Sequence, residues 1–254
     1  MFLLLRWMFY TMLMLAALPA FADETVMLKS GFMSLDARGS FSAAAGGLAG
    51  TAINFDSTMR FSRSNRETLE AALQLGDFRA ALNYFPLNFS ADGPLASGIV
   101  FNGQSFAAGD SVHASLKADV FDASLTYYLL NIDDLPARMQ FGVEAAVKTV
   151  HVTSTLQNRS TGITQSTSTT LPIPTLGARG RLAMSDFLGL SGRVGYLGYA
   201  GNHFLDTEVQ LEFSPLPDVG VYAGYRLIDL KLDRSGILLD SSISGPFIGG
   251  FIRF

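Results

Sequence analysis

The chain closes on Ser241–Phe254, which reads SSISGPFIGGFIRF. Steps of two back from the last residue meet only apolar or small residues: Phe254, Ile252, Gly250, Ile248 and Pro246. A period of two is typical of an extended strand whose two faces differ. We therefore predict a terminal β-strand, and the question becomes whether the rest of the chain alternates in the same way.

The composition is too apolar for a disordered chain and lightly charged for a soluble enzyme. The chain has 254 residues, of which 48% are hydrophobic and 16% charged, with a formal net charge of −4. No basic run points to a nucleic-acid partner. The absence of cysteine excludes disulfides, thiolate metal sites and cysteine nucleophiles. No phosphate loop or metal-ligand spacing is present, so we expect neither a cofactor nor a metal.

The first residues have the pattern of an export signal. Arg6 precedes an apolar run over Trp7–Leu18, and Ala20 and Ala22 then form an Ala-x-Ala cleavage site. We predict a cleaved signal peptide over residues 1–22 and one mature domain over residues 23–254. The alternative is an uncleaved anchor, but the run is shorter than the roughly 20 residues that a spanning helix needs.

Ten segments of the mature chain are predicted to be strands, most of them with alternating apolar and polar residues. They are Thr25–Arg38, Arg66–Leu75, Phe78–Phe89, Ser111–Leu130, Ala137–Leu156, Leu171–Met184, Leu188–Tyr199, His203–Phe213, Asp218–Leu232 and Ser242–Phe254. In Ser111–Leu130 the apolar phase changes above about Asp119. That change predicts either a β-bulge or a half-strand that stands outside a membrane.

Long and short connections alternate along the chain, and this alternation decides the predicted fold class. Long polar loops are predicted at Gly39–Asn65, Ser90–Asp110, Gln157–Thr170 and Asp233–Ser241, with a shorter one at Ala200–Asn202. Short turns follow the second, fourth, sixth and eighth strands. A soluble β-sandwich would alternate too, but it would not sort its connections in this way. We predict an all-β fold, a closed antiparallel transmembrane β-barrel of about ten strands, with eight as the alternative, short periplasmic turns and long outer loops.

The polar face of this barrel is predicted to line its lumen with charges of both signs. These residues are Glu70, Arg79, Asp122, Arg138, Glu144, Lys148, Arg179, Arg181, Arg193, Asp206, Glu208, Glu212 and Arg226. Continuing the inward faces across the turn Ser214–Pro217 sets Arg226 opposite Asp206 and diagonal to Glu208, which predicts ion pairs. Two interpretations stay open: a structural network that fills the lumen, or a constriction that selects solutes.

Outer-facing aromatic residues are predicted to form the girdles that barrels carry at the membrane interfaces. They are Tyr84, Phe121, Tyr127, Tyr196, Phe213, Tyr225 and Phe254. The three histidines, His113, His151 and His203, fall near outer strand ends in no recognisable catalytic motif. Outer-membrane hydrolases use histidine with a carboxylate or serine, which makes these residues catalytic candidates. Because no such motif surrounds them, we expect the protein not to be an enzyme.

Two stretches resemble a family of bacterial outer-membrane barrel proteins with no assigned activity. They are Phe101–Leu130, in which FNGQ-F enters a long strand, and Asp229–Phe254, in which Gly-Pro-Phe leads to an aromatic terminus. The resemblance implies a bacterial outer-membrane location. In such barrels an alternating last strand with a C-terminal aromatic is recognised by the insertion machinery. The resemblance thus implies that Ile248, Ile252 and Phe254 form that signal here.

The sequence therefore predicts a porin-like, monomeric outer-membrane protein of a Gram-negative cell envelope. We expect partners to be outer-membrane lipid, lipopolysaccharide and the barrel-insertion machinery. The first functional hypothesis is a structural protein or narrow passive channel for small solutes. The alternatives are a surface interaction or adhesion barrel that acts through its outer loops, and a lipid- or peptide-hydrolysing barrel.

Overall fold

The computed structural model describes residues 24–43, 51, 53–54, 60–132, 138–199, 201–234 and 237–254. Ten long strands form the wall: β1 (Glu24–Ala43), β3 (Ser64–Leu75), β4 (Phe78–Pro94), β7 (Ser111–Ile132), β8 (Met139–Asn158), β9 (Thr164–Ala183), β10 (Leu188–Tyr199), β11 (Asn202–Phe213), β12 (Val219–Arg234) and β13 (Ile237–Arg253). The predicted signal peptide and its cleavage site lie outside the described residues.

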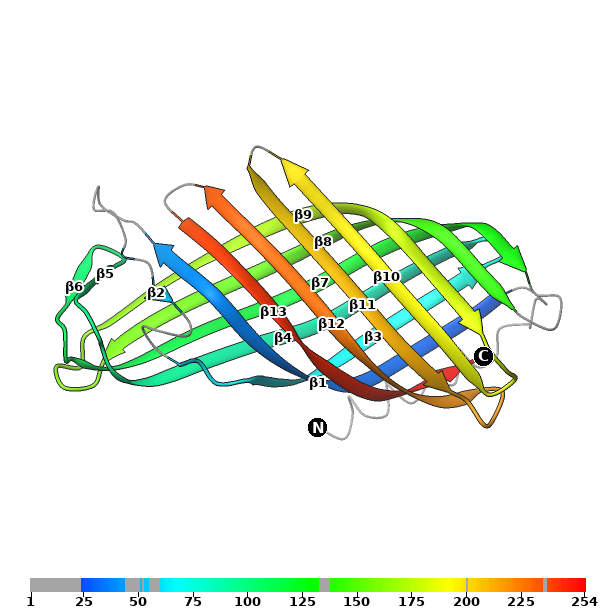
Figure 1. Ribbon diagram of the computed structural model, residues 1–254, viewed down its shortest axis with the longest axis horizontal. Coiled ribbons are helices and arrows are strands. Elements are labelled where there is room, and N and C mark those ends of the chain that lie inside the picture. The colour runs from blue at the N-terminus through cyan, green and yellow to red at the C-terminus, as the bar shows by residue number, and fades with distance from the viewer. Residues whose placement is uncertain are drawn as a thin grey trace, which may run out of the picture.

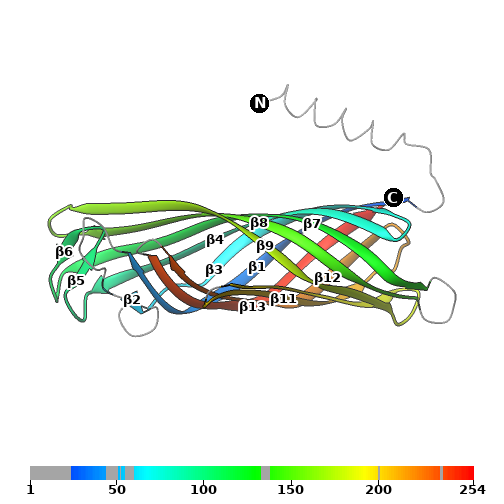
Figure 2. The same ribbon diagram turned by 90° about the horizontal axis from the view of Figure 1, so that it is seen from above.

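Each long strand pairs antiparallel with its neighbours in chain order, and β13 pairs with β1. This last pairing closes the sheet into a barrel, seen from two sides in Figures 1 and 2. The predicted closed antiparallel barrel of ten strands is confirmed, and the count of eight is wrong. Closure pairs every strand on both sides in the membrane half, as a strand protein in lipid requires. In the outer half, β9 beyond Leu176 has no pairing with β10, and β4 beyond Tyr84 has none with β3.

None of the described residues belongs to a helix long and apolar enough to cross a membrane.

Two predicted outer loops are wrong, because strands continue through them. Most of Gln157–Thr170 is strand, since β8 ends at Asn158 and β9 begins at Thr164. Asp233–Ser241 is likewise mostly strand, because β13 begins at Ile237. The Ser/Thr-rich sequence has no apolar period, but threonine has a high β-propensity and both faces of an extension beyond lipid can be polar. Longer strands therefore replace most of these two loops.

A small hairpin lies inside the predicted loop Ser90–Asp110. It consists of β5 (Ile99–Phe101) and β6 (Gln104–Phe106), while a two-residue strand, β2 (Ile53–Asn54), adds to β1 within the predicted first loop. The turn residues Asn102 and Gly103 have φ angles of 48° and 78°. Positive φ at both positions is the signature of a type I′ turn, which Asn-Gly favours. The FNGQ motif is therefore a hairpin turn.

The outside of the barrel carries an apolar belt. Large exposed apolar residues on its strands include Leu69, Leu82, Phe121, Leu125, Phe141, Val143, Val147, Leu176, Tyr196, Val209, Leu211, Val221, Tyr225 and Ile248. Exposed side chains of this kind in a closed barrel are explained by contact with lipid, because a water-soluble protein rarely exposes so continuous an apolar surface. The alternating face predicted to be apolar is therefore the outer one.

Strand β7 explains the phase change that the sequence shows near Asp119. The register against β4 is continuous there, and the irregularity lies instead between Tyr128 and Leu130. A bulge at Asp119 is therefore wrong. Above this level Val120 and Val112 are buried inside, while Lys117 is exposed on the outer face. The outer half of the strand thus faces water outside and an apolar core inside.

Two adjoining apolar clusters pack inside the barrel, and Tyr222 and Phe251 of the first lie toward the end with the short turns. The first, which we call the inner plug, comprises Met33, Leu35, Phe85, Leu87, Phe89, Val120, Ile173, Phe204, Tyr222, Ile228, Phe247 and Phe251. The second packs the β5–β6 hairpin onto the wall and comprises Ala91, Leu95, Ile99, Phe101, Phe106, Val112, Ala114 and Leu156. Asn102 at the hairpin tip also donates hydrogen bonds to Gln165 and to the carbonyl of Ser166 on β9.

Glycines on the inner face of β12 and β13 make room for the aromatic rings of the inner plug. A Cβ at Gly224 would collide with the ring of Phe247, and one at Gly249 would lie 2.5 Å from the Tyr222 hydroxyl. Rings can therefore lie flat over glycine positions of the neighbouring strand, a device known to stabilise sheets with inward glycines. The predicted GPFIGGF stretch thus combines small residues and aromatics for packing reasons.

Candidate functional site: the charged lumen

Asp206 on β11 is the centre of a charge cluster that fills the middle of the lumen. Arg226 on β12 donates two hydrogen bonds to the Asp206 carboxylate, from Nε and Nη2, both 2.9 Å long. Lys148 Nζ lies 3.0 Å and Arg193 Nη2 lies 3.3 Å from Oδ2 of the same carboxylate. Arg226 is 0% exposed, and Lys148 and Asp206 are 2% exposed. Such burial is tolerable because each charge has a close partner of the opposite sign.

Asp122 on β7 joins the same cluster from the opposite part of the wall. Lys148 Nζ donates to its Oδ2 at 2.6 Å and Arg193 Nη1 at 2.9 Å. Lys148 and Arg193 therefore each bridge Asp122 to Asp206. These bridges connect the β7–β8 pair to the β10–β11 pair across the lumen, between parts of the wall that share no backbone hydrogen bonds.

Two further ion pairs extend the cluster along the wall. Arg79 donates to Glu70 at 2.6 Å, and Arg179 donates to Glu144 at 2.6 Å. Glu144 also accepts a hydrogen bond from Thr126 at 3.0 Å. Charge-assisted hydrogen bonds of this length are among the stronger ones in proteins.

Glu212 forms the lower edge of the cluster, nearest the short turns. Arg181 donates to it at 3.1 Å, and Ser191 and Gln210 add hydrogen bonds. Lys29 Nζ lies 3.8 Å from the same carboxylate and 5.3 Å from the ring centroid of Tyr222. Lys29 was missed by sequence reasoning, although it shares the inward phase of β1 with the buried Met33 and Leu35.

The register of β12 against β11 differs from the predicted one by two residues. Arg226 stands directly opposite Glu208 and diagonal to Asp206, the reverse of the prediction. The turn consumes more residues than expected, since β11 ends at Phe213 and β12 begins at Val219. A shift of two leaves inward residues inward, and the long Arg226 side chain reaches the diagonal carboxylate. Its Nη1 is 3.8 Å from Glu208.

Arg138 is placed apart from the other predicted lumen residues. It precedes β8 at the end of the barrel where the short turns lie, and its carbonyl accepts a hydrogen bond from Ala183. No ion pair is recorded for it within the described part of the chain. Twelve of the thirteen predicted charges thus take part in ion pairs, while Arg138 lines the mouth.

The inner plug seals the charge cluster from the outer side. The Arg226 guanidinium lies 3.9 Å from the ring centroid of Phe85, which is 1% exposed. A guanidinium stacked on an aromatic face gains a cation–π attraction and loses contact with water. Phe85 is not among the predicted site residues, because an inward phenylalanine is unexpected on a polar lumen face, and the inside becomes apolar above Arg79 only in the packed structure.

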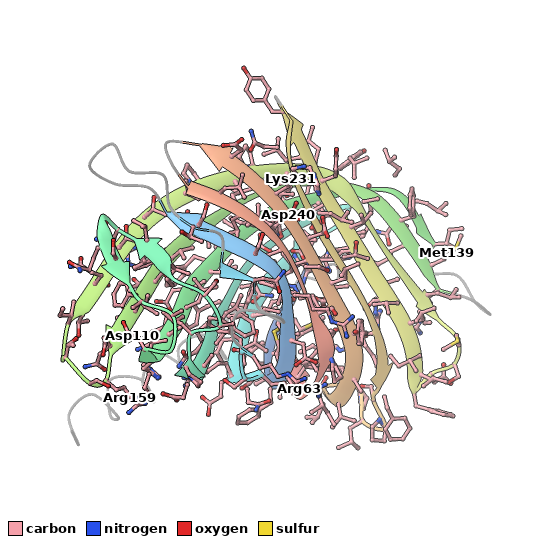
Figure 3. The ribbon with its side chains drawn as sticks, turned by 60° about the vertical axis from the view of Figure 1, so that its left-hand side comes forward. Arg63, Asp110, Met139, Arg159, Lys231 and Asp240 are labelled. Carbon is pink, nitrogen blue, oxygen red and sulfur yellow. The ribbon has the colours of Figure 1, made fainter. Side chains whose placement is uncertain are left out.

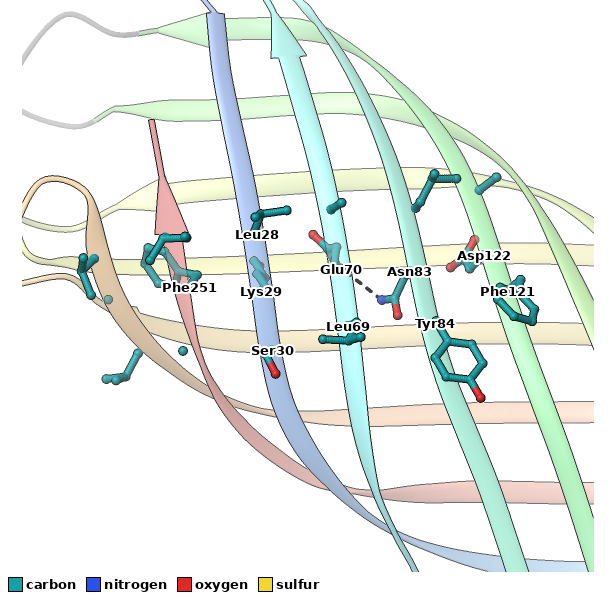
Figure 4. A pocket seen from close by; sticks show the side chains of 18 of the residues that line it. Leu28, Lys29, Ser30, Leu69, Glu70, Asn83, Tyr84, Phe121, Asp122 and Phe251 are labelled. Carbon is teal, nitrogen blue, oxygen red and sulfur yellow. Dashed lines mark hydrogen bonds between the residues drawn. The ribbon is translucent and has the colours of Figure 1, made fainter. Parts of the chain in front are cut away.

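The wall of the cluster is also visible from the lipid side (Figure 4). A shallow apolar groove of about 1050 Å³ runs over β1, β3, β4, β7, β8, β12 and β13 on the outside of the barrel. Glu70 and Asn83 appear there joined by a hydrogen bond of 3.5 Å, while Leu69 and Phe121 stand outside. A concave apolar waist of this kind fits lipid acyl chains, so we assign it no ligand.

The three histidines lie on the outer face of the wall, each beside one polar partner. His203 Nε2 is 2.6 Å from Asp229, and His113 Nδ1 is 2.9 Å from Asp92. His151 Nδ1 is 2.8 Å from the hydroxyl of Thr170. Among the described residues, no group of three or more His, Asp or Glu side chains could hold a metal ion.

The charged residues at the outer end of the barrel are exposed, unlike those of the charge cluster. Figure 3 shows Arg159 and Asp110 at this outer end and Met139 at the other end of the wall. Arg159 donates to Asp92 through Nε at 3.0 Å, and both side chains are more than half exposed. Its hydrogen bonds, and a further one with His113, hold the pKa of the Asp92 carboxyl below its usual range.

Comparisons with solved structures identify the fold. The outer membrane protease OmpT from Escherichia coli superposes with a TM-score of 0.62 at 11% identity, covering 94% of this chain and 99% of OmpT. Ail of Yersinia pestis, with sucrose octasulfate bound, gives 0.44 at 10% identity over 91% of this chain and 99% of its own. The translocator domain of NalP from Neisseria meningitidis gives 0.44 at 13% over 91% and 88%.

Comparison with protein-family models finds no match, and comparison with curated protein sequences finds none. The likeness to OmpT shows the fold alone, and the other two superpositions are too weak to add to it. With its closed ten-strand sheet and apolar belt, the protein is a β-barrel of the bacterial outer membrane.

Proposed function

We propose that this protein is a non-enzymatic outer-membrane scaffold with a locked lumen, which acts through its outer surface. The observation that carries the proposal is the occupancy of the lumen. Asp206, Lys148 and Arg226 meet at mid-barrel with almost no exposed surface, and the inner plug covers them. A hydrated ion could pass only by separating these buried charges, which is costly. The geometry therefore favours a structural network over a passive channel.

The outer extension supplies a surface for interaction. We call it the outer wall: the outer halves of β4, β7, β8 and β9 together with the β5–β6 hairpin, which project on the left of Figure 1. Its outward side chains are mainly small and polar, among them Thr153, Thr155, Ser166 and Ser168. The apolar cluster beneath the hairpin makes it rigid. A rigid polar surface held outside the membrane is suited to contact with other molecules rather than to transport.

The hydrolase hypothesis lacks a comparable arrangement. His151 contacts a threonine hydroxyl, and His203 contacts a lone aspartate on the outer face of the wall. A catalytic centre needs such groups to converge with others in a cavity. The interior at the same height is filled by apolar side chains.

A complementation experiment separates the surface role from an enzymatic one. Two variants are compared with wild type in a bacterium that lacks the protein: Thr153→Lys/Thr155→Lys/Ser168→Lys, which changes the outer wall, and His151→Gln/His203→Gln. We expect wild type and the histidine variant to confer the same cell aggregation or attachment, and the lysine variant to lose it. Surface labelling and heat-modifiability must show equal insertion. Full activity of the lysine variant, or loss with the histidine variant, would contradict the proposal.

A further inference from the structure

A second cavity opens at the end of the barrel opposite the outer wall. It has a volume of about 440 Å³ and lies where the short turns and the chain terminus gather. Its lining comes from the first residues of β1, β8 and β10, from the turn between β3 and β4, and from the last residues of β7, β9, β11 and β13. In an outer-membrane barrel this end faces the periplasm, so we call the cavity the periplasmic vestibule.

The vestibule carries an excess of positive charge. Six basic residues line it, Lys29, Arg79, Arg138, Arg179, Arg181 and Arg253, against two carboxylates. One of these carboxylates, Asp77, accepts a hydrogen bond from Asn131. The other, Glu212, pairs with Arg181 and Lys29. Arg79 and Arg179 are paired with Glu70 and Glu144 behind the lining, so the positive excess comes mainly from Arg138 and Arg253. The low-dielectric walls of the narrow mouth concentrate the field of these charges.

Several guanidinium donors in the vestibule have no hydrogen-bond acceptor. Arg79 is only 5% exposed, and its Nη1 is buried without a partner although Nη2 binds Glu70. Nε and Nη2 of Arg253 are buried and unpartnered as well. The Arg253 guanidinium lies 4.6 Å from the ring centroid of Phe251, which holds it against the wall. Buried donors without acceptors are unfavourable unless another group supplies the acceptor.

We propose that the periplasmic vestibule binds a small multivalent oxyanion, a ligand with two or more phosphate or carboxylate groups. Arginine forks match the paired oxygens of such groups. Arg79 and Arg253 line the cavity and carry buried donors that lack acceptors, and Arg138 adds a positive charge at the rim. The cavity lies within the usual size range of small-molecule sites. Because the vestibule is at the other end of the barrel, its occupancy does not depend on the proposed role of the outer wall.

Binding of pyrophosphate and citrate to the refolded mature protein in zwitterionic micelles tests the proposal. We expect saturable binding of at least one probe by titration calorimetry and a raised unfolding temperature. The variant Arg138→Gln/Arg253→Gln should weaken binding by about tenfold or more. Arg66→Gln, which removes an exposed charge at the outer end of β3, should leave it unchanged. Binding of one probe alone identifies the phosphate or the carboxylate class.

A chemical-protection experiment gives the same answer without relying on a variant that must fold. Phenylglyoxal modification of the wild type is followed by mass spectrometry, with and without pyrophosphate or citrate. We expect the ligand to protect Arg253 and Arg138 while Arg66 and Arg159 stay equally reactive. No saturable binding of either probe, or protection that misses Arg253, would overturn the proposal. Binding that survives unchanged in Arg138→Gln/Arg253→Gln would do the same.

Discussion

The two halves of this barrel have opposite patterns along the same strands. In the membrane half, β7 points Phe121 and Leu125 outward and Asp122 and Thr126 inward. In the outer half the same strand points Lys117 outward and Val112 inward. The first half is apolar outside and polar inside, as lipid requires. The second, where β9 extends beyond its pairing with β10, is polar outside and apolar inside, as in a water-soluble protein. The solvent outside the wall, rather than the strand itself, decides which face is apolar.

The comparison predicts that the interior of the membrane half depends on charge pairing. In Asp206→Ala, three cations lose a shared carboxylate that cannot be replaced by water. We expect a loss of about 3–5 kcal/mol in the free energy of unfolding, measured by urea titration in micelles. The control is Asp36→Ala, because the Asp36–Arg63 pair is largely exposed at the outer end. That control should cost at most about 1 kcal/mol. Equal losses in the two variants would show that burial does not govern the cost.

The interior of the outer half should instead depend on apolar packing. Leu156 is 1% exposed beneath the β5–β6 hairpin. Leu156→Ala should lower stability by about 2–5 kcal/mol because it leaves a cavity. Gln157→Ala on the exposed face of the same strand is the control and should change stability by less than about 0.5 kcal/mol. A Leu156→Ala protein as stable as the control would mean that the outer half has no packed core.

Replacement of a charge pair by apolar residues sharpens the contrast. In Asp206→Leu/Arg226→Leu one charge of each sign is removed, and the side chain at 226 stays beside Phe85. Lys148 and Arg193 lose Asp206 but keep Asp122, so we expect a smaller loss than in Asp206→Ala, where Arg226 also stays buried without its main partner. Unfolding of all three variants under identical conditions provides the comparison. A double variant less stable than Asp206→Ala would show that the pair itself stabilises the barrel.

The smallest effect is expected at the exposed cluster of the outer wall. The pKa of Asp92 is held down by Arg159 and His113, so its pairing stabilises the fold above the ordinary pKa of about 3.9. That stabilisation is lost as the pH falls through the lower folded-state pKa. A carboxyl ¹³C NMR titration should show this pKa rising in Arg159→Gln. An Asp92 pKa that stays the same in wild type and variant would exclude the interaction.

The sequence predicts most of this fold because apolar and polar residues alternate strictly wherever one face of a strand contacts lipid. β10 spans Leu188–Tyr199, as predicted, and the wall has the predicted ten strands. The extensions of β8 and β9 were missed because, outside lipid, Ser and Thr can occupy both faces. Asn102-Gly103 is a typical hairpin-turn sequence, but the segment around it was predicted to be a loop. Assignment of Ile248, Ile252 and Phe254 as the insertion signal stays a prediction.

The lumen site was predictable as a set of residues but not as a set of pairs. Inward phase identifies Asp206, Glu208 and Arg226 from alternation alone. Their partners depend on register and side-chain reach, and a turn longer than expected moved Arg226 to face Glu208. Lys29 was not predicted to face the lumen, because β1 continues into the outer half, where the interior is apolar. The alternation of apolar and polar residues along β1 is therefore weak. The role of the cluster follows from burial and from the inner plug, which only the packed structure displays.

The central claim is that the buried cluster around Asp206 and the inner plug close the lumen. Single-channel recording of the refolded mature protein, residues 23–254, in planar bilayers tests it most directly, once a heat-modifiability gel has shown that the barrel is folded. Wild type should give no discrete conductance steps at high protein load. Regular steps of uniform size from folded wild type, reduced or abolished in Arg226→Ala or Glu208→Ala, would contradict the account and make the lumen a narrow pore.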